Sequence, residues 1–537
     1  MSATPLLSID GLSVSYGDTP AISLIDATLQ AGETLAIVGE SGSGKTTTAQ
    51  AIVGLLGDNA RITHGSITLR GEELVGREER FLRTIRGRRI GLVPQDPTNS
   101  FNPVHTIGET IAEAIAIHNP RGATRQRVVE LLDKVGVDRP ELRYGQYPHE
   151  LSGGLRQRAL IAAAIAGEPE LIIADEPTSA LDVTVQDVVL DVLAEMTREL
   201  GAGVLLITHD LAVAGDRADR IMVMNKGQVV ESGTSARVMG APREDYTQRL
   251  ISHAPSLNSP TTPAAVEPAE TYPLLRVERL SKSFPGVTAV DDVSFEVGRG
   301  TTHGLVGESG SGKTTIGRII SMFHTPSSGQ VLLGDTSLSD ASPAQVRALR
   351  RRVQLVYQNP YSSFDPRLSL GESVAEPLRN FGHVRRRRER QEHVEEAFSK
   401  VHLDPALASR RPRELSGGQL QRAAIARALV VRPELIVLDE AVSALDVTVQ
   451  AQILETLHDL QEELGLTYVF ISHDLAVVRA ISSTVSVMQR GRQVDYGPVA
   501  EVFDNPSDEF TRRLVHAIPG RVLRARLEEQ RYVHYVI

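Results

Sequence analysis

The sequence contains no cysteine among its 537 residues. This absence excludes disulfides, cysteine-ligated zinc and iron–sulfur clusters, so we expect neither zinc nor an iron–sulfur cofactor. Long hydrophobic runs are also missing, and no stretch approaches the ~20 apolar residues that a membrane-spanning helix needs. The N-terminal segment lacks the positive and apolar regions of a signal peptide. If the protein works at a membrane, we therefore expect other subunits to supply the membrane spans.

Basic residues are outnumbered by acidic ones. Lysine and arginine total 57 against 67 acidic residues, which gives a net charge of −10. Domains that bind nucleic acid are usually basic, so no nucleic-acid partner is expected. The contents of 41% hydrophobic and 23% charged residues are ordinary for a soluble globular protein and argue against disorder.

Three short motifs occur twice along the chain. GESGSGKT occupies residues 39–46 and 307–314, LSGG occupies 151–154 and 415–418, and SALDVTVQ occupies 179–186 and 443–450. The second and third pairs share an offset of 264 residues, and so long a period indicates a repeated domain and not a solenoid. The sequence therefore predicts two domains, residues 1–251 and 274–537, joined by a linker at 252–273 that is rich in proline, alanine and threonine.

Each repeat alternates short apolar runs with helical patterns. An apolar run leads into a glycine-rich turn and a helix, and further runs such as LIIAD and LIVLD follow. Such runs are typical of buried parallel strands with helices between them. The sequence therefore predicts an α/β fold with a parallel core sheet. Between Gln95 and Leu151, and between Gln358 and Leu415, the pattern becomes helical, which indicates an inserted helical subdomain.

The motif GxxxxGK[ST] predicts a phosphate-binding loop in each domain. Its glycines let the backbone wrap phosphates with N–H groups pointing inward, and the following helix adds a positive dipole end. Lys45 and Lys313 are expected to reach the β- and γ-phosphates, while Thr46 and Thr314 offer hydroxyls to Mg²⁺. The ATP-binding residues expected in these loops are Gly39, Ser41, Gly42, Ser43, Gly44, Lys45, Thr46 and Thr47, and Gly307, Ser309, Gly310, Ser311, Gly312, Lys313, Thr314 and Thr315.

An acidic pair ends one apolar run in each domain, as Asp175–Glu176 and Asp439–Glu440. An aspartate at the carboxyl end of an apolar strand lies beside the phosphates, where it can orient Mg²⁺. The adjacent glutamate can position and deprotonate the attacking water. The sequence therefore predicts Glu176 and Glu440 as catalytic residues, with ATP and Mg²⁺ as the cofactors.

The segments LSGGLRQR at 151–158 and LSGGQLQR at 415–422 resemble the signature motif of ABC-type ATPases. The resemblance covers essentially the whole chain. It implies two tandem ABC-type P-loop ATPase domains, each with a RecA-like parallel core sheet, an antiparallel β subdomain and an inserted helical subdomain. In this family the two domains form a head-to-tail sandwich, so each ATP would lie between the phosphate loop of one domain and the signature of the other.

The resemblance assigns further residues by their motifs. Catalytic switch histidines would be His209 and His473, D-loop aspartates Asp182 and Asp446, and the aromatics that stack on adenine Tyr16 and Phe284. The signature residues that would contact ATP are Ser152, Gly153, Gly154, Ser416, Gly417, Gly418 and Gln419. The Q-loop glutamines Gln95 and Gln358 would contact ATP and would bind Mg²⁺ together with Thr46, Asp175, Thr314 and Asp439.

The two halves depart from the family pattern at one position each. Leu155 stands where the signature usually has glutamine, and Ala441 follows Glu440 where proline is usual. Neither departure removes a group that binds phosphate or metal or that acts as a base. We therefore expect both sites to hydrolyse ATP.

Further segments resemble the ATPases of the oligopeptide/dipeptide (peptide/nickel) permease family, here with both ATPase subunits fused in one chain. They include PHELSGGLRQR, ELSGGQLQRAAIARAL, QDPTNSFNP and QNPYSSFDP. The resemblance implies the ATP-hydrolysing motor of an importer for peptides. Two transmembrane permease subunits would hold it peripherally at the cytoplasmic face of the plasma (inner) membrane, and an extracytoplasmic substrate-binding protein would deliver the solute.

Alternative functions remain open from the sequence. The alternative to a peptide importer is the fused ATPase of an importer for another solute, such as nickel, glutathione, haem or a sugar. A soluble ribosome-associated ABC ATPase is disfavoured, because that class carries a long, charged, helical linker. ABC ATPases of DNA repair carry zinc cysteines or long coiled coils, and this sequence has neither.

Overall fold

The computed structural model describes residues 4–179, 181–254, 273–382, 384, 386–443 and 445–524. The described residues form two units, one of residues 4–254 with 519–524 and the other of residues 273–518. Each unit contains one copy of the repeat. Within the described ranges, no helix has both the length and the apolar character that a membrane crossing requires.

Two sheets build the first unit. A four-stranded antiparallel sheet has the order β2-β1-β4-β5, and a six-stranded sheet has the order β10-β9-β3-β8-β7-β6. Their bounds are β1 Leu7–Tyr16, β2 Thr19–Leu29, β3 Thr34–Val38, β4 Ala60–Leu69, β5 Glu72–Glu73, β6 Ile90–Val93, β7 Leu171–Asp175, β8 Gly203–Thr208, β9 Arg220–Asn225 and β10 Gln228–Thr234. All pairs in the larger sheet are parallel except β9 with β10.

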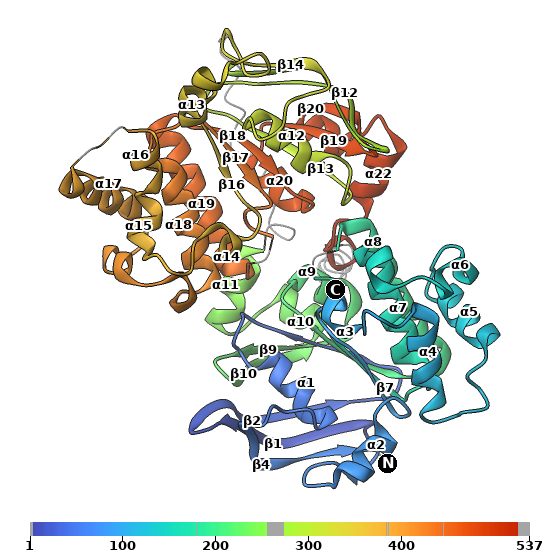
Figure 1. Ribbon diagram of the computed structural model, residues 1–537. Coiled ribbons are helices and arrows are strands. Elements are labelled where there is room, and N and C mark those ends of the chain that lie inside the picture. Colours follow the sequence, from blue (N-terminus) through green and yellow to red (C-terminus); the bar gives the residue numbers. More distant parts are fainter. Residues whose placement is uncertain are drawn as a thin grey trace, which may run out of the picture. The chain divides into compact units, whose positions relative to one another are not determined.

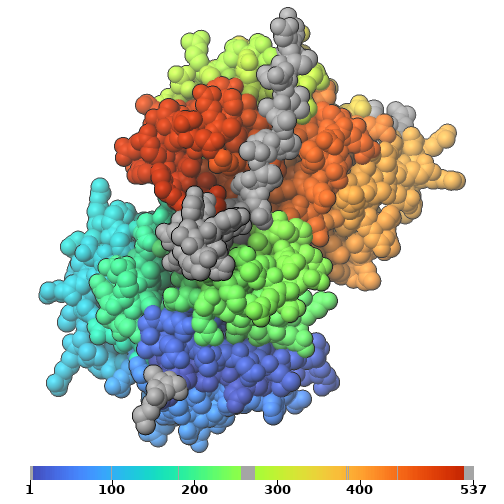
Figure 2. Space-filling model, turned by 180° about the vertical axis from the view of Figure 1, so that it is seen from behind, coloured from blue at the N-terminus to red at the C-terminus, as the bar shows by residue number. Residues whose placement is uncertain are grey.

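The central strands are largely apolar because both of their faces are covered. Leu171 and Ile173 of β7 lie in a core with the antiparallel sheet and α1, whereas Ile172 and Ala174 lie in a second core with α7. Side chains alternate between the faces of a strand, so burial on both sides favours apolar residues throughout the strand, and the polar Asp175 and Thr208 stand at the last positions of β7 and β8. In Figure 1, α1 lies between the two sheets of this unit, and α4 to α7 gather at one side of it. The blue residues, which include β1 and β2, form a continuous outer layer of the first unit (Figure 2).

The helices of the first unit include the inserted subdomain predicted from the sequence. They are α1 Lys45–Val53, α2 Glu79–Ile85, α3 Pro97–Ser100, α4 Ile107–Ala116, α5 Arg125–Lys134, α6 Pro140–Tyr144, the 3₁₀ helix η1 Pro148–Glu150, α7 Gly153–Ile165, α8 Val183–Leu200, α9 Leu211–Arg217, α10 Ser235–Gly240 and α11 Asp245–His253. Apolar residues of α4, α5 and α7 share one core, which explains why these helices pack as a group.

The second unit repeats this architecture, with sheets in the orders β12-β11-β14-β15 and β16-β17-β18-β13-β19-β20. Its strands are β11 Leu275–Phe284, β12 Val287–Val297, β13 Thr302–Gly307, β14 Ser328–Leu333, β15 Thr336–Ser337, β16 Val353–Val356, β17 Leu435–Asp439, β18 Thr467–Ile471, β19 Thr484–Gln489 and β20 Arg492–Pro498. The predicted fold, a core sheet with an antiparallel sheet and inserted helices in each repeat, is confirmed.

The helices of the second unit follow the same sequence order. They are α12 Lys313–Ile320, α13 Pro343–Arg352, α14 Pro360–Ser363, α15 Leu370–Val374, α16 Glu376–Asn380, α17 Arg387–Lys400, η2 Pro405–Ser409, η3 Pro412–Glu414, α18 Gly417–Leu429, α19 Val447–Leu464, α20 Leu475–Ile481, α21 Val499–Asp504 and α22 Glu509–His516.

The ends of the units differ from the boundaries expected from the sequence in one respect. The second domain was expected to continue to residue 537, whereas residues 519–524 group with the first unit. Hydrogen bonds from this segment to Asp216 account for the difference. The expected linker at 252–273 lies largely outside the described residues, which stop at 254 and resume at 273.

Candidate active site

Four neighbouring strands of the first unit end at one edge of the core sheet, and each leads into a predicted site residue. β3 leads into Gly39, β7 ends at Asp175, β8 leads into His209, and β6 is followed two residues later by Gln95. The carboxyl ends of parallel strands meet at one edge of a sheet, which is where α/β proteins bind ligands. The strand order therefore brings together residues that lie far apart in the sequence.

The loop after β3 has a backbone that only glycine can provide at two positions. Gly39 has φ 152° and Gly44, the N-cap of α1, has φ 100°. A Cβ on Gly39 would lie 2.2 Å from the carbonyl oxygen of Met224 on β9, and one on Gly307 would lie 2.1 Å from that of Met488. These distances are far below contact, so both loops depend on glycine where they pass the neighbouring strand.

The predicted phosphate-binding lysines point back into their own loops. Lys45 Nζ donates to the carbonyl oxygens of Gly39 at 2.7 Å and Glu40 at 2.9 Å. Lys313 Nζ makes the same two contacts in the second unit, both at 2.7 Å. Both lysines are 5% exposed, so each ammonium group is held inside a loop whose following helix begins at the lysine itself. A buried cation at a helix N-terminus is suited to bind phosphate oxygens.

The threonine after each lysine meets the aspartate at the end of a core strand. Thr46 Oγ1 donates to Asp175 Oδ1 at 3.2 Å, and Thr314 Oγ1 donates to Asp439 Oδ1 at 3.0 Å. Burial raises the pKa of both aspartates above the ordinary value, and the threonine hydrogen bonds partly offset this rise. A hydroxyl and a carboxylate are the hard oxygen ligands that Mg²⁺ prefers, so the donor chemistry fits this ion.

Glu176 lies between the predicted Q-loop and switch residues. Gln95 Nε2 donates to Glu176 Oε2 at 2.8 Å, and His209 Nδ1 lies 3.4 Å from the same oxygen. Burial raises the pKa of Glu176, but the hydrogen bond and charge of His209, together with Lys45 and Gln95, lower it more, so its pKa lies below the ordinary value. The carboxylate is therefore ionised at neutral pH and able to accept a proton.

The second unit repeats this arrangement. Gln358 Nε2 donates to Glu440 Oε2 at 2.6 Å, and His473 Nδ1 lies 3.5 Å from that oxygen. Glu176 and Glu440 also share an uncommon backbone, with φ 47° and 50°. A residue other than glycine in this region carries a strain of about 1–3 kcal/mol, and such strain concentrates at functional sites. The strained turn directs each glutamate toward its glutamine and histidine.

His473 should titrate above its ordinary pKa of 6.5. Burial lowers the pKa of His473, but the hydrogen bond and charge of Glu440 raise it more, while the pKa of Glu440 falls below 4.5. The stability contributed by His473 is present below pH 6.5 and is lost as the pH rises through its raised pKa. The contribution of Glu440 is present above pH 4.5 and is lost as the pH falls through its lowered pKa. NMR of ¹³C-labelled histidine, assigned with His473→Gln, measures this midpoint.

The control for this titration is Glu440→Gln, which removes the charge but keeps the shape of the side chain. In this variant the pKa of His473 should move down, because burial would still lower it while the hydrogen bond and charge of Glu440 would no longer raise it. A midpoint that is the same with and without the Glu440 carboxylate would show that the pair is not coupled.

The signature serines cap the helices that follow them. Ser152 Oγ accepts the Leu155 N–H at 3.4 Å, and Ser416 Oγ accepts the Gln419 N–H at 3.3 Å. Gln419 also accepts the Ser416 N–H at 3.0 Å, which completes a capping box. The leucine cannot return this bond and instead packs against the apolar core of its unit. The sequence difference between the signatures thus becomes a difference in how the two helices begin.

The last glycine of each LSGG signature has a packing role that the sequence did not reveal. A Cβ on Gly154 would lie 2.4 Å from Val185 Cγ1, and one on Gly418 would lie 2.4 Å from Val449 Cγ1. Val185 follows the predicted D-loop residue Asp182, whose Oδ1 accepts the Val185 N–H at 3.0 Å. The glycine therefore allows the signature helix to approach the D-loop helix closely.

The predicted adenine-stacking aromatics lie on a different element from the phosphate loop. Tyr16 and Phe284 are the last residues of β1 and β11. Phe284 is 39% exposed and contacts the edge of His324, with ring centroids 5.6 Å apart. Stacking on adenine stays a prediction for both, as do the individual roles of the signature, Q-loop and D-loop residues.

The sequence predicted the members of the site but not their direct contacts. The hydrogen bonds from Gln95 and Gln358 to Glu176 and Glu440 were missed, because both glutamines were expected at Mg²⁺. The signal that could have suggested the contact is the strand order, since β6 and β7 are adjacent. A parallel neighbour places residues that follow the two strands within reach of each other.

Comparison with known proteins relates both units to one family. The sequence model of the ABC transporter family matches residues 22–179 and 290–443. The chain is 43% identical to the peptidoglycan transport ATP-binding protein YejF of Agrobacterium fabrum, with 96% of each chain covered. It is 40% identical to the oligopeptide transport ATP-binding protein OppD of Mycobacterium tuberculosis, which covers 96% of this chain and 98% of the relative.

A third relative differs in the solute that its name gives. The glutathione import ATP-binding protein GsiA of Pectobacterium atrosepticum is 40% identical, over 95% of this chain and 88% of the relative. Each of the three matches thus extends over both units and not over one ATPase domain alone.

Proposed function

The chain belongs to the ABC transporter family, and from this membership we propose that it is the ATP-hydrolysing motor of an importer that carries peptides. The observation that supports the proposal most is that both copies of the site are complete. The threonine–aspartate, glutamine–glutamate and histidine–glutamate contacts recur in the two units with distances that differ by no more than 0.2 Å. A chain that used one of its two sites only to bind ATP would not need this set of contacts at both sites.

In the proposed reaction, a water oxygen attacks the γ-phosphorus of ATP. The bond from that phosphorus to the bridging oxygen breaks, ADP leaves with the bridging oxygen, and the water proton passes to Glu176 or Glu440. The lowered pKa keeps each carboxylate ready to accept the proton. Lys45 and Lys313 hold the phosphates, and the histidines hold the glutamates in place.

Mg²⁺ is proposed to bind at each threonine–aspartate pair. Thr46 with Asp175, and Thr314 with Asp439, would hold it together with the Q-loop glutamine. Mg²⁺ usually takes its remaining ligands from substrate phosphates and water. When bound, it would supply positive charge that offsets the negative charge of the phosphates during the reaction.

We further infer that the two sites are composite, as in other members of the family. Ser416 and Gly418 would close on the nucleotide held by Lys45, and Ser152 with its following glycines would close on the nucleotide held by Lys313. Each signature serine caps a helix, so N–H groups of the first turn are directed toward an approaching γ-phosphate.

The proposed partners are two permease subunits in the membrane and an extracytoplasmic binding protein. The chain itself would be peripheral, on the cytoplasmic face of the plasma (inner) membrane. Peptide is the proposed solute class because the three relatives are named for peptidoglycan, oligopeptide and glutathione transport, and all three compounds contain peptide units.

Co-purification from membranes tests this function. The tagged chain, isolated from detergent-solubilised membranes of its own cells, is expected to recover two membrane-spanning proteins. In the reconstituted assembly, ATP turnover should rise when the binding protein carries a peptide and should not rise with nickel, haem or a sugar. Recovery with ribosomes and without any membrane protein would contradict the importer.

A further inference from the structure

The last described residues of the chain, 519–524, group with the first unit. Residues 521–524 are helical, and the N–H of Arg524 donates to the carbonyl oxygen of Gly520 at 3.1 Å. Gly520 is therefore the N-cap of this helical turn, which we call the C-terminal turn. The N–H groups at the start of a helix have no partner within it, and a capping side chain usually accepts them. Glycine has no such side chain, so the acceptor must come from elsewhere.

Asp216 on α9 supplies this acceptor. Its Oδ2 accepts the N–H of Gly520 and its Oδ1 accepts the N–H of Leu523, both at 2.7 Å. These are the N-cap and third positions of the C-terminal turn, the two positions that a capping box satisfies with two side chains. A carboxylate at a helix N-terminus also interacts favourably with the positive end of the helix dipole. One side chain of α9 thus does the work of both caps.

The residue before Asp216 is a glycine within α9, although glycine is less favourable in a helix than alanine. A Cβ on Gly215 would lie 2.6 Å from Leu523 Cδ2, and the three atoms nearest to that Cβ position all belong to Leu523. The leucine is 1% exposed. Gly215 therefore leaves open the space in which Leu523 is buried, and the neighbouring carboxylate binds the backbone of the same turn.

The corresponding helix of the second unit lacks both features. Counted along the repeat, α20 has Arg479 and Ala480 where α9 has Gly215 and Asp216. Arg479 pairs with Asp504 of α21 at 2.7 Å, and alanine offers no acceptor for N–H groups. The sequence difference between the two helices therefore makes α9, and not α20, the partner of the C-terminal turn.

The other end of α9 lies at the edge where the site residues gather. His209 stands two residues before the helix, and its Nδ1 lies 3.4 Å from Glu176 Oε2. Asp210, the N-cap of α9, accepts the N–H groups of the second and third helical residues at 2.8 and 3.2 Å. The helix has seven residues, so its two ends are only about 10 Å apart. A displacement of the end that carries Asp216 would therefore be passed to His209.

Other contacts of α9 limit how far it could move. Arg217 pairs with Asp187 and Asp191 of α8, and Ser235 Oγ donates to the carbonyl oxygen of Gly215 at 3.0 Å. These contacts would keep the helix folded if the C-terminal turn were released. We therefore expect a small shift of α9 and not its unfolding.

We propose that the C-terminal turn positions His209, because Gly215 and Asp216 hold the turn and this contact fixes α9. The inference rests on the proposed function of the site that contains Glu176, here called the first site. His209 contacts Glu176, whereas Asp216 is a positioning residue that acts through the helix. Loss of the contact should affect the first site and leave the second, that of Glu440, unchanged.

Hydrogen exchange of the full-length variant Asp216→Asn tests the contact itself. An asparagine side chain has one carbonyl oxygen in place of two carboxylate oxygens, so one N–H group of the C-terminal turn loses its acceptor. Exchange in the C-terminal turn should rise by about tenfold or more, as expected for a hydrogen bond to a charged group. Exchange should also rise in α9 and stay the same in α20. Wild-type exchange rates in α9 would show that the contact does not hold this helix.

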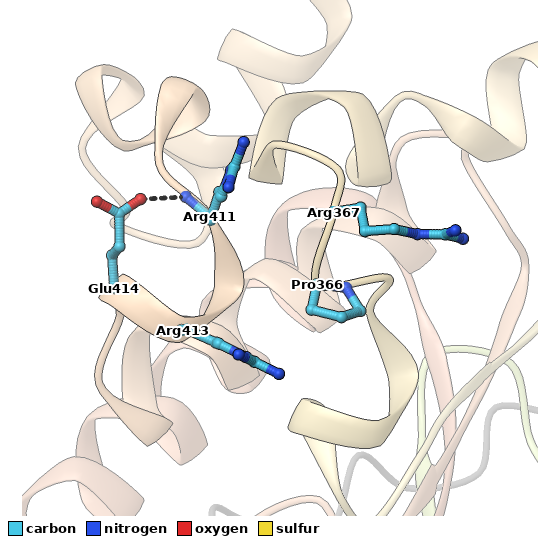
Figure 3. Close-up of a pocket in the computed structure, with 5 residues that line it drawn as sticks. All are labelled: Pro366, Arg367, Arg411, Arg413 and Glu414. Atoms are coloured by element: carbon cyan, nitrogen blue, oxygen red, sulfur yellow. Dashed lines mark hydrogen bonds between the residues drawn. The ribbon is translucent and has the colours of Figure 1, made fainter.

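Glu414→Gln is the matched control in the second unit. Glu414 Oε2 accepts the backbone N–H of Arg411 at 2.7 Å, the bond drawn as a dashed line in Figure 3. The variant therefore makes the same change from carboxylate to amide at an acceptor of a backbone N–H. It should leave exchange in α9 at the wild-type rate, and a rise there equal to that in Asp216→Asn would contradict the proposal.

ATP turnover tests the link to the first site. Asp216→Asn is combined with Glu440→Gln, which leaves hydrolysis to the first site, and separately with Glu176→Gln, which leaves it to the second. In the first combination kcat should fall by about tenfold relative to Glu440→Gln alone, with KM for ATP unchanged because the phosphate loop is untouched. In the second combination kcat should equal that of Glu176→Gln alone. Equal losses in both would give Asp216 a general structural role and overturn the proposal.

A double-mutant cycle tests the packing of Gly215 on Leu523. Gly215→Ala should raise exchange in α9 and lower turnover of the first site, because the added Cβ displaces the leucine. In the Leu523→Ala background the same substitution should have no further effect, since the atoms that it would meet are gone. Additive effects of the two substitutions would show that Gly215 does not act through the C-terminal turn.

The variant His209→Gln separates failure of this inference from failure of the proposed function. If His209→Gln, in the Glu440→Gln background, leaves turnover of the first site unchanged, the proposed role of the histidine fails and this inference fails with it. If His209→Gln lowers turnover and Asp216→Asn does not, only the positioning by the C-terminal turn is wrong.

Discussion

Replacing Glu176 and Glu440 together by glutamine should lower ATP turnover by about 10²- to 10⁴-fold, the range that a general base contributes. Glutamine keeps the shape of glutamate and can still accept the hydrogen bond from Gln95 or Gln358, but it cannot take a proton from water. Each single variant should also turn over more slowly, since both sites have the full set of contacts. Steady-state phosphate release measures the effect.

ATP binding should survive this change, because Lys45 and Lys313 are held by their own loops. Binding of a fluorescent ATP analogue therefore separates lost chemistry from lost folding. Glu231→Gln is a suitable control, since Glu231 is also buried but pairs with Arg237, away from the edge where the site residues gather. Full turnover in Glu176→Gln or Glu440→Gln would show that the altered site is not required.

Replacing Gly39 by alanine should both destabilise the first unit and abolish its ATP binding. The added Cβ would lie 2.2 Å from the Met224 carbonyl oxygen and 2.9 Å from Ser43 Oγ. The first of these is backbone in the core sheet and cannot turn away, so the loop must move. We expect the free energy of unfolding to fall by about 3 kcal/mol or more, as for other severe steric changes in a core. Denaturation followed by circular dichroism measures this loss.

Gly42→Ala is the matched control within the same loop. Gly42 has φ 77°, so alanine is strained there, but no atom lies within 4 Å of its Cβ position. The expected loss is about 1–2 kcal/mol, the strain of a left-handed residue alone. Equal losses in the two variants would mean that the contact with Met224 does not restrict the loop. The same comparison is available at Gly307 and Gly310 in the second unit.

Much of the site could be predicted because its residues belong to short contiguous motifs. Lys45 and Thr46 are specified by a loop whose glycines have a local purpose, and Asp175 with Glu176 ends an apolar strand. The repeat then supported each assignment with a second copy of the same motif, since an offset of 264 residues recurs in separate motifs. These features depend on neighbours in the sequence, so they can be recognised from the sequence alone.

Other features were not predictable because they arise between distant segments. The closeness of Gln95 and Glu176 follows from the order of β6 and β7 in the sheet. The packing role of Gly154 against Val185 follows from how two helices cross. No sequence pattern around either residue predicts that contact, and the signature motif alone suggested a role only at the nucleotide.

By itself, the sequence determined that this protein has two ATPase domains with complete phosphate loops, acidic pairs and signatures, because each is a local pattern that recurs. Only the tertiary structure decided which side chains Glu176 and Glu440 contact, how the two signature helices begin, and where residues 519–524 pack. The physical reason is that chain connectivity specifies residues in order, whereas hydrogen bonds and steric contacts depend on distances in space, which the strand order and helix packing set.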